Sequence, residues 1–358
     1  MKVGIIGAGI AGLSCAHFLE RNGVFSHVYE RNHRIGNLFT YGEIVLNLMT
    51  RPYDSLEIMN RMGISLQPLS TLKRLVIKSP KNKVEIKGKL GYIFERGQGE
   101  NSVENQIAKN LTSKIFFNIN ANYESLMKEY DHVVIATGNS MMAKSITEWE
   151  NIVSASIKGG IAIGNFEPDT VYVWFDRSYA NSGFGYLVPL GPKKASLVLV
   201  VTYSLKEEVE NMWQEFLSKE KINFSMVETF ESELEIGMPR HRSIGKVYLV
   251  GNAGGFLDSA FGFGLINSMM SSFYCSFSIV KGYNYEEKVL NLQKKLNNLR
   301  KIRERMDTGT NEDIERLIGL MKNPLVKTLV YNTNIDIFSY LPFFMKFGTK
   351  KPGKKPGL

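Results

Sequence analysis

The sequence has very little cysteine and no recognisable metal-binding pattern. Only two of its 358 residues are cysteines, Cys15 and Cys275, too few for a disulfide framework. The five histidines are scattered, without the spacing of a metal site. The motifs GxSxG and HExxH are absent. We therefore expect an intracellular protein that holds no metal.

Acidic residues are fewer than basic ones, and the excess lies at one end of the chain. The sequence has 44 lysines and arginines against 35 acidic residues, a formal net charge of +9. Five of the lysines lie in the last thirteen residues. A nucleic-acid-binding surface spreads basic residues along a groove between aromatic ones. We therefore expect no nucleic-acid partner.

Long apolar segments are also rare. Residues 259–280 carry no charge over 22 positions, enough to span a bilayer. The stretch contains six serines, Asn267 and two glycines near its start, so it is too polar for a membrane span. We predict a buried helix. Residues 1–15 lack the pattern of a signal peptide, and we expect a cytoplasmic location.

A glycine-rich motif stands at the start of the chain. The apolar run 2–6 is followed by Gly7, Gly9 and Gly12, then by a helical stretch and a short extended segment that ends at Glu30. In this βαβ context, GxGxxG binds the pyrophosphate of a dinucleotide at a helix N-terminus. Glu30 would accept the ribose hydroxyls and repel a 2′-phosphate. These features predict a site for FAD or NAD rather than NADP.

The remaining elements indicate an α/β fold. Helical spacing occurs at 50–62, 101–111 and 205–220, short strands at 74–79, 83–88 and 89–94, and strand-rich sequence at 155–203. Residues 131–138 read as a buried parallel strand, and 246–255 restore the strand–glycine–helix order. We predict a discontinuous Rossmann-like domain (1–62, 95–154 and 237–282) with an inserted α+β substrate domain (63–94 and 155–236). C-terminal helices and a basic tail occupy 283–358.

Four segments carry a family resemblance. They are GAGIAG with Glu30 and Arg31, the stretch 91–108, VVIATG at 133–138, and KVYLVGNAGGFLDSAFGFGLINS at 246–268. In this order they resemble the single-Rossmann FAD proteins of the para-hydroxybenzoate hydroxylase type, and within them the geranylgeranyl reductase-like branch. A second GxGxxG motif after a strand is absent, which argues against a reductase with two dinucleotide sites.

The resemblance implies an FAD-dependent oxidoreductase that reduces a carbon–carbon double bond in an isoprenoid or lipid-like substrate. The electrons would come from NAD(P)H or a small redox carrier. The implied FAD-binding residues are Gly7, Gly9, Ala11, Gly12, Glu30, Arg31, Arg96, Thr137, Gly138, Gly251, Asn252, Gly262, Gly264 and Leu265. Catalytic side chains are not identified. The helix that starts near residue 265 would stabilise negative charge on the reduced flavin.

The sequence departs from the family pattern at three places. Asn252 replaces an aspartate that contacts the ribityl chain, and Tyr41 stands where reductases of this branch have a cysteine. The GYLVPL segment only partly matches the family's aromatic substrate motif. We predict an apolar substrate pocket lined by Tyr41, Tyr172, Trp174, Tyr186 and Pro189. The alternative is that these aromatic residues form the core of a β layer. The alternatives are an FAD-dependent monooxygenase and a non-catalytic flavin-binding protein at the membrane.

The C-terminal segment is rich in aromatic residues and ends in lysines. Apolar residues recur between 325 and 347, and GTKKPGKKPGL follows. Aromatic residues beside lysines are typical of proteins that bind anionic lipid surfaces. The segment therefore indicates either peripheral contact with the inner face of the membrane or a helix packed on the body with a solvated tail.

Overall fold

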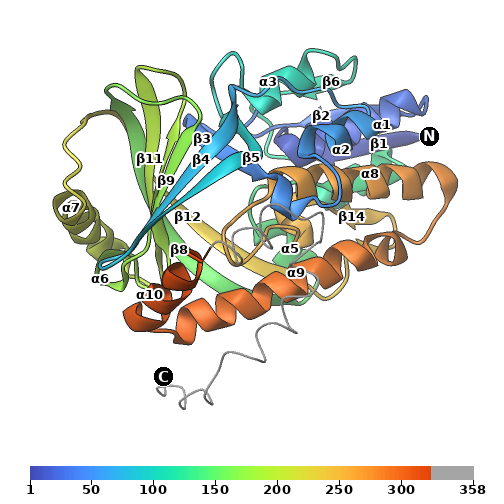
Figure 1. The fold of residues 1–358 in the computed structure, drawn as a ribbon. Helices are drawn as coiled ribbons and strands as arrows, with labels where there is room; N and C mark the ends of the chain where they lie inside the picture. The colour runs from blue at the N-terminus through green and yellow to red at the C-terminus, as the bar shows by residue number, and fades with distance from the viewer. Residues whose placement is uncertain (324–358) are drawn as a thin grey trace.

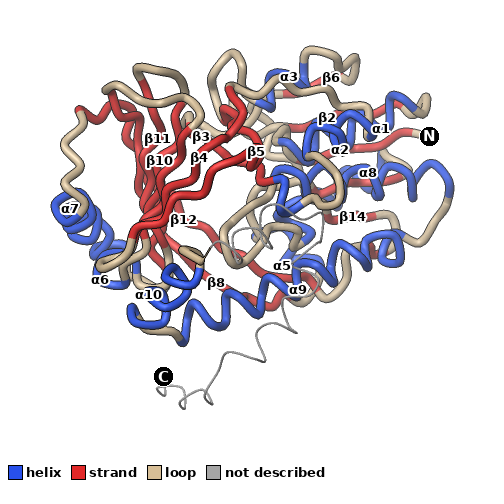
Figure 2. The backbone as a smooth tube through the Cα atoms, in the orientation of Figure 1, coloured by secondary structure: helices blue, strands red, loops and turns tan. Residues whose placement is uncertain are grey.

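Two β-sheets organise the part of the chain that the structure describes, residues 1–323 of this computed structural model (Figure 1). Figure 2 shows the two sheets as separate groups of strands with helices on their outer sides. Sheet membership does not follow chain order, because the chain passes back and forth between the sheets.

The six-stranded sheet has the Rossmann arrangement. Its strand order is β13-β14-β7-β1-β2-β6, and β1 pairs in parallel with both β2 and β7. β13 is antiparallel to β14, and the other pairs are parallel. The strand bounds are β1 Lys2–Ile6, β2 Phe25–Tyr29, β6 Lys114–Phe116, β7 His132–Ile135, β13 Ser243–Ile244 and β14 Val247–Leu249. These strands come from three separate stretches of chain, so the predicted discontinuous α/β fold is confirmed.

The eight-stranded sheet has the order β12-β8-β11-β10-β9-β4-β5-β3, antiparallel throughout except for the pair β4–β9. Its strands are β3 Tyr41–Leu46, β4 Ser70–Lys78, β5 Lys83–Arg96, β8 Trp149–Ile163, β9 Thr170–Trp174, β10 Phe184–Pro189, β11 Lys194–Thr202 and β12 Ser225–Pro239. Helix α7 (Val209–Lys219) packs on one face, where Trp213 and Phe216 lie against Leu187 and Leu197. The opposite face of this sheet lines a cavity.

The other helices flank the two sheets and connect them. They are α1 Ile10–Arg21, α2 Ser55–Arg61, α3 Val103–Ala108, α4 Tyr123–Glu129, α5 Met141–Ile146, α6 Arg177–Ala180, α8 Leu265–Lys281, α9 Tyr285–Thr308 and α10 Asn311–Leu320. Figure 1 shows α9 running from the end of α8 beneath both sheets to α10. C-terminal helices were predicted for the region that starts at residue 283, and α9 and α10 lie there.

The uncharged stretch 259–280 forms most of α8, whose serines lie in the interior. Ser272 Oγ donates to the Ala11 carbonyl at 2.8 Å, and Ser276 Oγ donates to that of Cys15 at 3.2 Å. These bonds satisfy the buried hydroxyls of Ser272 and Ser276, because each one meets a backbone oxygen of α1, whereas the buried Ser278 Oγ has no partner within residues 1–323. The prediction of a buried helix is thus confirmed. Of the helices within residues 1–323, none has the length and hydropathy to cross a bilayer.

Two strand predictions differ from the structure. The segments 83–88 and 89–94 form one strand, β5, in which Gly88 and Gly91 adopt positive φ angles. Its pairing with β4 shifts register between Lys87 and Gly91 and resumes beyond this irregularity, and residues 91–96 also pair with β3. Residues 225–239 form β12, which was not predicted. The division into domains stays a prediction, although β3 pairs with the eight-stranded sheet. The aromatic segment and lysine tail after residue 323 lie outside the described residues.

Candidate functional site

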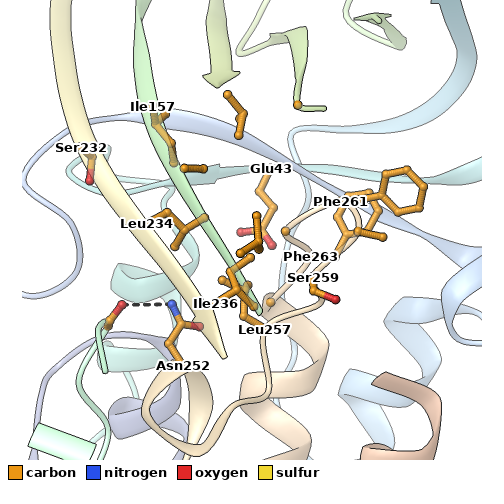
Figure 3. Close-up of a pocket in the computed structure, with 18 of the residues that line it drawn as sticks. Glu43, Ile157, Ser232, Leu234, Ile236, Asn252, Leu257, Ser259, Phe261 and Phe263 are labelled. Atoms are coloured by element: carbon orange, nitrogen blue, oxygen red, sulfur yellow. Dashed lines mark hydrogen bonds between the residues drawn. The ribbon is translucent and has the colours of Figure 1, made fainter. Parts of the chain in front are cut away.

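A large cavity lies between the two sheets. Its volume is about 3110 Å³, and it extends from the carboxyl ends of β1 and β2 to the free face of the eight-stranded sheet. Parallel sheets bind ligands at this edge, where helix N-termini converge. Figure 3 shows part of the cavity, with side chains from β3, β8, β12 and the turn before α8 pointing into it.

The cavity brings together most of the predicted cofactor residues. Those that line it are Gly7, Gly9, Ala11, Glu30, Arg31, Arg96, Thr137, Gly138, Asn252, Gly262 and Gly264. Gly12, Gly251 and Leu265 do not line it. A Cβ on Gly12 would lie 1.9 Å from the Gly7 carbonyl oxygen, and one on Gly251 would lie 2.7 Å from the Ala11 Cβ. Gly12 therefore allows α1 to pack against the loop at Gly7, and Gly251 allows the turn after β14 to pack against α1.

Three glycines open directly onto the cavity. A Cβ added to Gly9, Gly138 or Gly262 would meet no atom within 4 Å. Gly9 is also the N-cap residue of α1, and no side chain caps that helix. The first N–H groups of α1 and its positive dipole end thus face open space, as a bound pyrophosphate requires. The site fits a dinucleotide in shape and in donor groups.

Glu30 lies at the end of β2 and is fixed by the backbone. Its carboxylate accepts hydrogen bonds from the N–H of Ala8 at 2.8 Å and of Asn32 at 2.9 Å, and its residue is 7% exposed. Each carboxylate oxygen has a further lone pair for a hydroxyl donor. The Glu30 carboxylate is therefore placed to accept hydrogen bonds from ribose hydroxyls beside the glycine loop.

Asn252 links two of the glycine motifs. Its Nδ2 donates to the Gly138 carbonyl oxygen at 3.1 Å, the dashed contact in Figure 3. An aspartate at this position could not donate that bond when ionised. The replacement of aspartate by asparagine thus has a structural role here, since the amide holds the turn after β7 against the turn after β14.

Sequence reasoning did not single out Asp258, which organises the turn before α8. It is completely buried, and its carboxylate accepts from the N–H of Ala260 at 2.7 Å and from those of Phe261 and Phe263. Burial raises the pKa of Asp258 to about 6, against the lowering effect of these donors and of Arg303. An aspartate in a glycine-rich loop is a common signal of such a turn.

Arg96 lines the cavity but is paired with protein groups. Its Nε donates to Glu104 at 2.9 Å, and a terminal nitrogen donates to Glu43. Burial alone would lower the pKa of Arg96, but the charges of Glu104 and Glu43 outweigh burial and raise it. The guanidinium also lies over the Tyr41 ring, 5.4 Å from its centroid. The predicted cofactor contact of Arg96 stays a prediction.

The side of the cavity formed by the eight-stranded sheet is mainly apolar. The lining side chains from the sheet include Leu75, Ile77, Val153, Ile157, Val171, Val173, Val188, Leu234 and Ile236. Tyr41 and Tyr186, two of the predicted pocket residues, also line it. The sheet thus presents a broad apolar surface to whatever binds beside the glycine motifs.

The structure corrects the placement of three predicted pocket residues. Tyr172 and Trp174 lie on the opposite face of β9, in the cluster beneath α7, while Val173 faces the cavity. Successive side chains of a strand point to opposite faces of the sheet. A prediction that is wrong by one residue about which side chains of β9 face the cavity therefore exchanges the two faces. Pro189 is buried beside Val188 and does not line the cavity.

Comparison with known proteins supports this arrangement. Residues 5–49 match a family model described as an NAD(P)-binding Rossmann-like domain. The small chain of glutamate synthase [NADPH] from Escherichia coli (strain K12) is 46% identical over 70 residues, 18% of this chain and 14% of that protein. The match to this curated relative thus spans about one seventh of its length.

Solved structures match over nearly the whole chain. A geranylgeranyl bacteriochlorophyll reductase-like protein from Thermoplasma acidophilum superposes with a TM-score of 0.72 at 14% identity, covering 95% of this chain and 98% of that one. The chain therefore shares the fold of that protein over nearly its whole length. A 2-methyl-3-hydroxypyridine-5-carboxylic acid oxygenase matches with a TM-score of 0.59 at 16% identity, over 90% and 93% of the two chains. The predicted resemblance is confirmed as a matter of fold.

The buried carboxyl of Asp258 predicts a pH-dependent stability. An aspartate titrates near pH 4 when unfolded and here near pH 6, so between these values the folded state holds more protons and loses stability as the pH rises. We expect the free energy of unfolding of the natural chain to fall by about 3 kcal/mol relative to Asp258→Asn between pH 4 and pH 7. Urea unfolding at several pH values measures this difference.

The matched control is Asp313→Asn at the exposed start of α10. There the Thr310 backbone N–H lowers the pKa of the Asp313 carboxyl. The free energy of unfolding of the natural chain relative to Asp313→Asn should therefore rise with pH, the opposite of the trend expected for Asp258. A difference between the natural chain and Asp258→Asn that stays constant with pH would contradict the burial argument.

Proposed function

We propose that this chain is an FAD-dependent oxidoreductase that reduces a carbon–carbon double bond in an isoprenoid or lipid-like substrate. The observation that carries the proposal is the large cavity, with dinucleotide-binding features at one end and a mainly apolar sheet face at the other. The fold shared with the reductase-like protein from Thermoplasma acidophilum supports it. NAD(P)H or a small redox carrier would supply the electrons.

The FAD would lie along the edge of the six-stranded sheet. The N-terminus of α1 would hold the pyrophosphate, Glu30 the ribose, and the turn 258–264 the ring end. FAD supplies hydride transfer when bound, and the protein contributes binding and orientation. The residues of the chain position the two reactants and exclude water, since apolar side chains cover the substrate side.

The cavity supports an apolar substrate. Val171, Val173 and Val188 project from neighbouring strands of one sheet face, and Ile157 and Leu234 continue that surface. Hydrophobic burial would hold a polyprenyl chain without directional contacts. Tyr186 also lines this part of the cavity. Burial raises the pKa of its hydroxyl, and the charges of Glu43 and Arg96 act on it as well.

A flavin-dependent monooxygenase is the second candidate. The fold match to a protein described as an oxygenase favours it. The two reactions would differ in the fate of the reduced cofactor: the reductase passes hydride to carbon under anaerobic conditions, whereas a monooxygenase consumes oxygen and inserts one of its atoms. The lining of the sheet face is mainly apolar, which favours the reductase. The hydroxyls of Tyr186, Thr202 and Ser232 are among the groups of this sheet that could orient a polar substrate.

We also propose that the protein contacts the inner face of the membrane through its C-terminal end. Leu317 and Leu320 on α10 are 63% and 61% exposed, and both line the rim of the cavity. The lysine-rich residues 348–358 follow in the sequence. A lipid substrate could enter from the bilayer at this rim.

The cofactor proposal predicts a defined effect of Gly9→Asn. Asparagine is a favoured N-cap residue, so α1 should still form. Its side chain would occupy the open space at Gly9 and bind the helix N–H groups that a phosphate needs. We expect FAD affinity to fall by about 100-fold or more, with the unfolding free energy changed by less than about 1 kcal/mol. Fluorescence titration with FAD and urea unfolding measure the two quantities.

Unchanged FAD affinity in the Gly9→Asn protein would contradict the assigned pyrophosphate position. A natural chain that takes up no FAD would contradict the proposed function itself.

The substrate proposal predicts that Val173→Trp shortens the cavity. We expect kcat/KM for a long polyprenyl substrate to fall by about tenfold or more while FAD content stays the same. Tyr172→Trp is the matched control, because its side chain points towards α7. Anaerobic turnover of polyprenyl lipids of increasing length measures the effect. An equal loss of kcat/KM in both variants would contradict the assignment of Val173 to the face of β9 that lines the cavity.

The membrane proposal predicts binding to vesicles that contain anionic lipid. Attraction between the lysines and the lipid headgroups should weaken as salt screens it. We expect deletion of residues 348–358 to reduce co-sedimentation, and neutral vesicles to bind little. Binding that is unchanged by the deletion and by salt would remove the tail from the proposal.

A further inference from the structure

Three buried charged side chains form a cluster at the centre of the cavity. Glu43 comes from β3, Arg96 from β5 and Glu104 from α3, and their side chains are 12%, 13% and 1% exposed. Arg96 forms ion pairs with both carboxylates. One positive charge thus faces two negative charges, so the fully ionised cluster carries an excess negative charge in a site shielded from water.

Glu43 joins this cluster to the N-terminus of α8. Its Oε1 accepts a hydrogen bond from the N–H of Leu265, the first residue of the helix, at 3.3 Å. Figure 3 shows the Glu43 side chain in the middle of the cavity, between the strands of the large sheet and the turn before α8. The other titratable groups around Glu43 are Tyr41 on its own strand, Tyr186 on β10 and Lys295 on α9.

A helix N-terminus without a counter-charge stabilises a negative charge placed next to it. This was the basis for expecting an anionic reduced flavin. Here a carboxylate already occupies that end of α8, and the N-cap residue Gly264 offers no side chain that would replace it. The carboxylate cancels the positive potential of the helix end, and like charges near each other disfavour the charged form of a neighbouring group.

We propose that Glu43 is a positioning residue that keeps the reduced cofactor neutral, by withholding the positive end of α8 from the flavin N1–C2=O edge. This inference rests on the proposed function, because it requires FAD in the cavity. Arg96 and Glu104 hold Glu43 in place. It also replaces the expectation that the start of α8 stabilises an anionic reduced flavin.

The redox balance differs between the two forms of the cofactor. Two-electron reduction of the oxidised flavin with uptake of two protons gives the neutral form, with hydrogen on N5 and N1. Uptake of one proton gives the anion, with N1 deprotonated. The electrons come from a reduced nicotinamide or, in the experiment, from dithionite. For a two-electron couple, each proton taken up shifts the reduction potential by about 30 mV per pH unit. The neutral reduced form therefore predicts a slope of about 60 mV per pH unit, and the anion a slope of about 30 mV per pH unit.

The experiment measures the two-electron reduction potential of the FAD-loaded protein from pH 6 to pH 8, by equilibration with reference dyes. We expect the natural chain to keep a slope of about 60 mV per pH unit. In Glu43→Gln the slope should fall to about 30 mV within this range, and the absorption spectrum of the reduced protein should change over the same pH interval. Glu43→Asp, which keeps the charge, should behave like the natural chain.

The matched control is Glu95→Gln. Glu95 is a buried carboxylate next to Arg96 on β5, but it does not line the cavity, so its loss should leave the slope unchanged. If Glu43→Gln does not fold, Glu43→Met supplies a neutral side chain of similar length.

The outcomes separate the two proposals. Failure of the natural chain to bind FAD would overturn the proposed function. Bound FAD with a natural-chain slope of about 30 mV, or an identical slope in the neutral variants, would overturn the role of Glu43 and leave the cofactor assignment standing.

Discussion

The close packing of α1 against α8 is the constraint on which the rest of the site depends. Ser272 and Ser276 donate to carbonyl oxygens of α1, and Gly251 leaves room for Ala11. Because the two helices lie together, both of their N-termini face one cavity at the edge of the six-stranded sheet. One helix end is open to a phosphate, and the other meets the charge cluster of Glu43.

The charges around the cavity are distributed according to what each region would bind. Glu30 and the open end of α1 provide acceptors and donors at the dinucleotide end. Asp258 and Glu43 place two buried carboxylates around the start of α8. Beyond them the sheet is aliphatic, and little polar surface competes with an apolar chain. In the proposed function, polar groups would bind the cofactor and apolar groups the substrate within one cavity.

Much of the fold followed from local patterns. The order of strand, glycine turn and helix at residues 2–30 predicted a βαβ unit. Gly7 and Gly12 meet steric requirements that the structure shows, and Gly9 leaves space open at the start of α1. Most of the residues implied by the family resemblance line one cavity. β12 was missed because Glu228, Glu231 and Glu233 interrupt its apolar pattern, and pairing with β8 supplies the order that local sequence does not.

The face of a strand and the partner of a charge were harder to predict. Tyr172 and Trp174 look like pocket residues in the sequence, but only the sheet as a whole decides which side of β9 meets α7. Arg96 and Glu43 lie 53 positions apart, and their pairing depends on the register of β3 with β5. Such contacts between distant residues leave no periodic signal in the sequence.

The most direct test of the account is a single anaerobic turnover. The FAD-loaded protein is reduced with one equivalent of dithionite, and a polyprenyl lipid in vesicles is added without oxygen. The account predicts that the flavin absorption returns in proportion to a lipid product that is heavier by two hydrogens. Return of the flavin absorption only after oxygen is admitted, with an oxygen atom in the product, would contradict it.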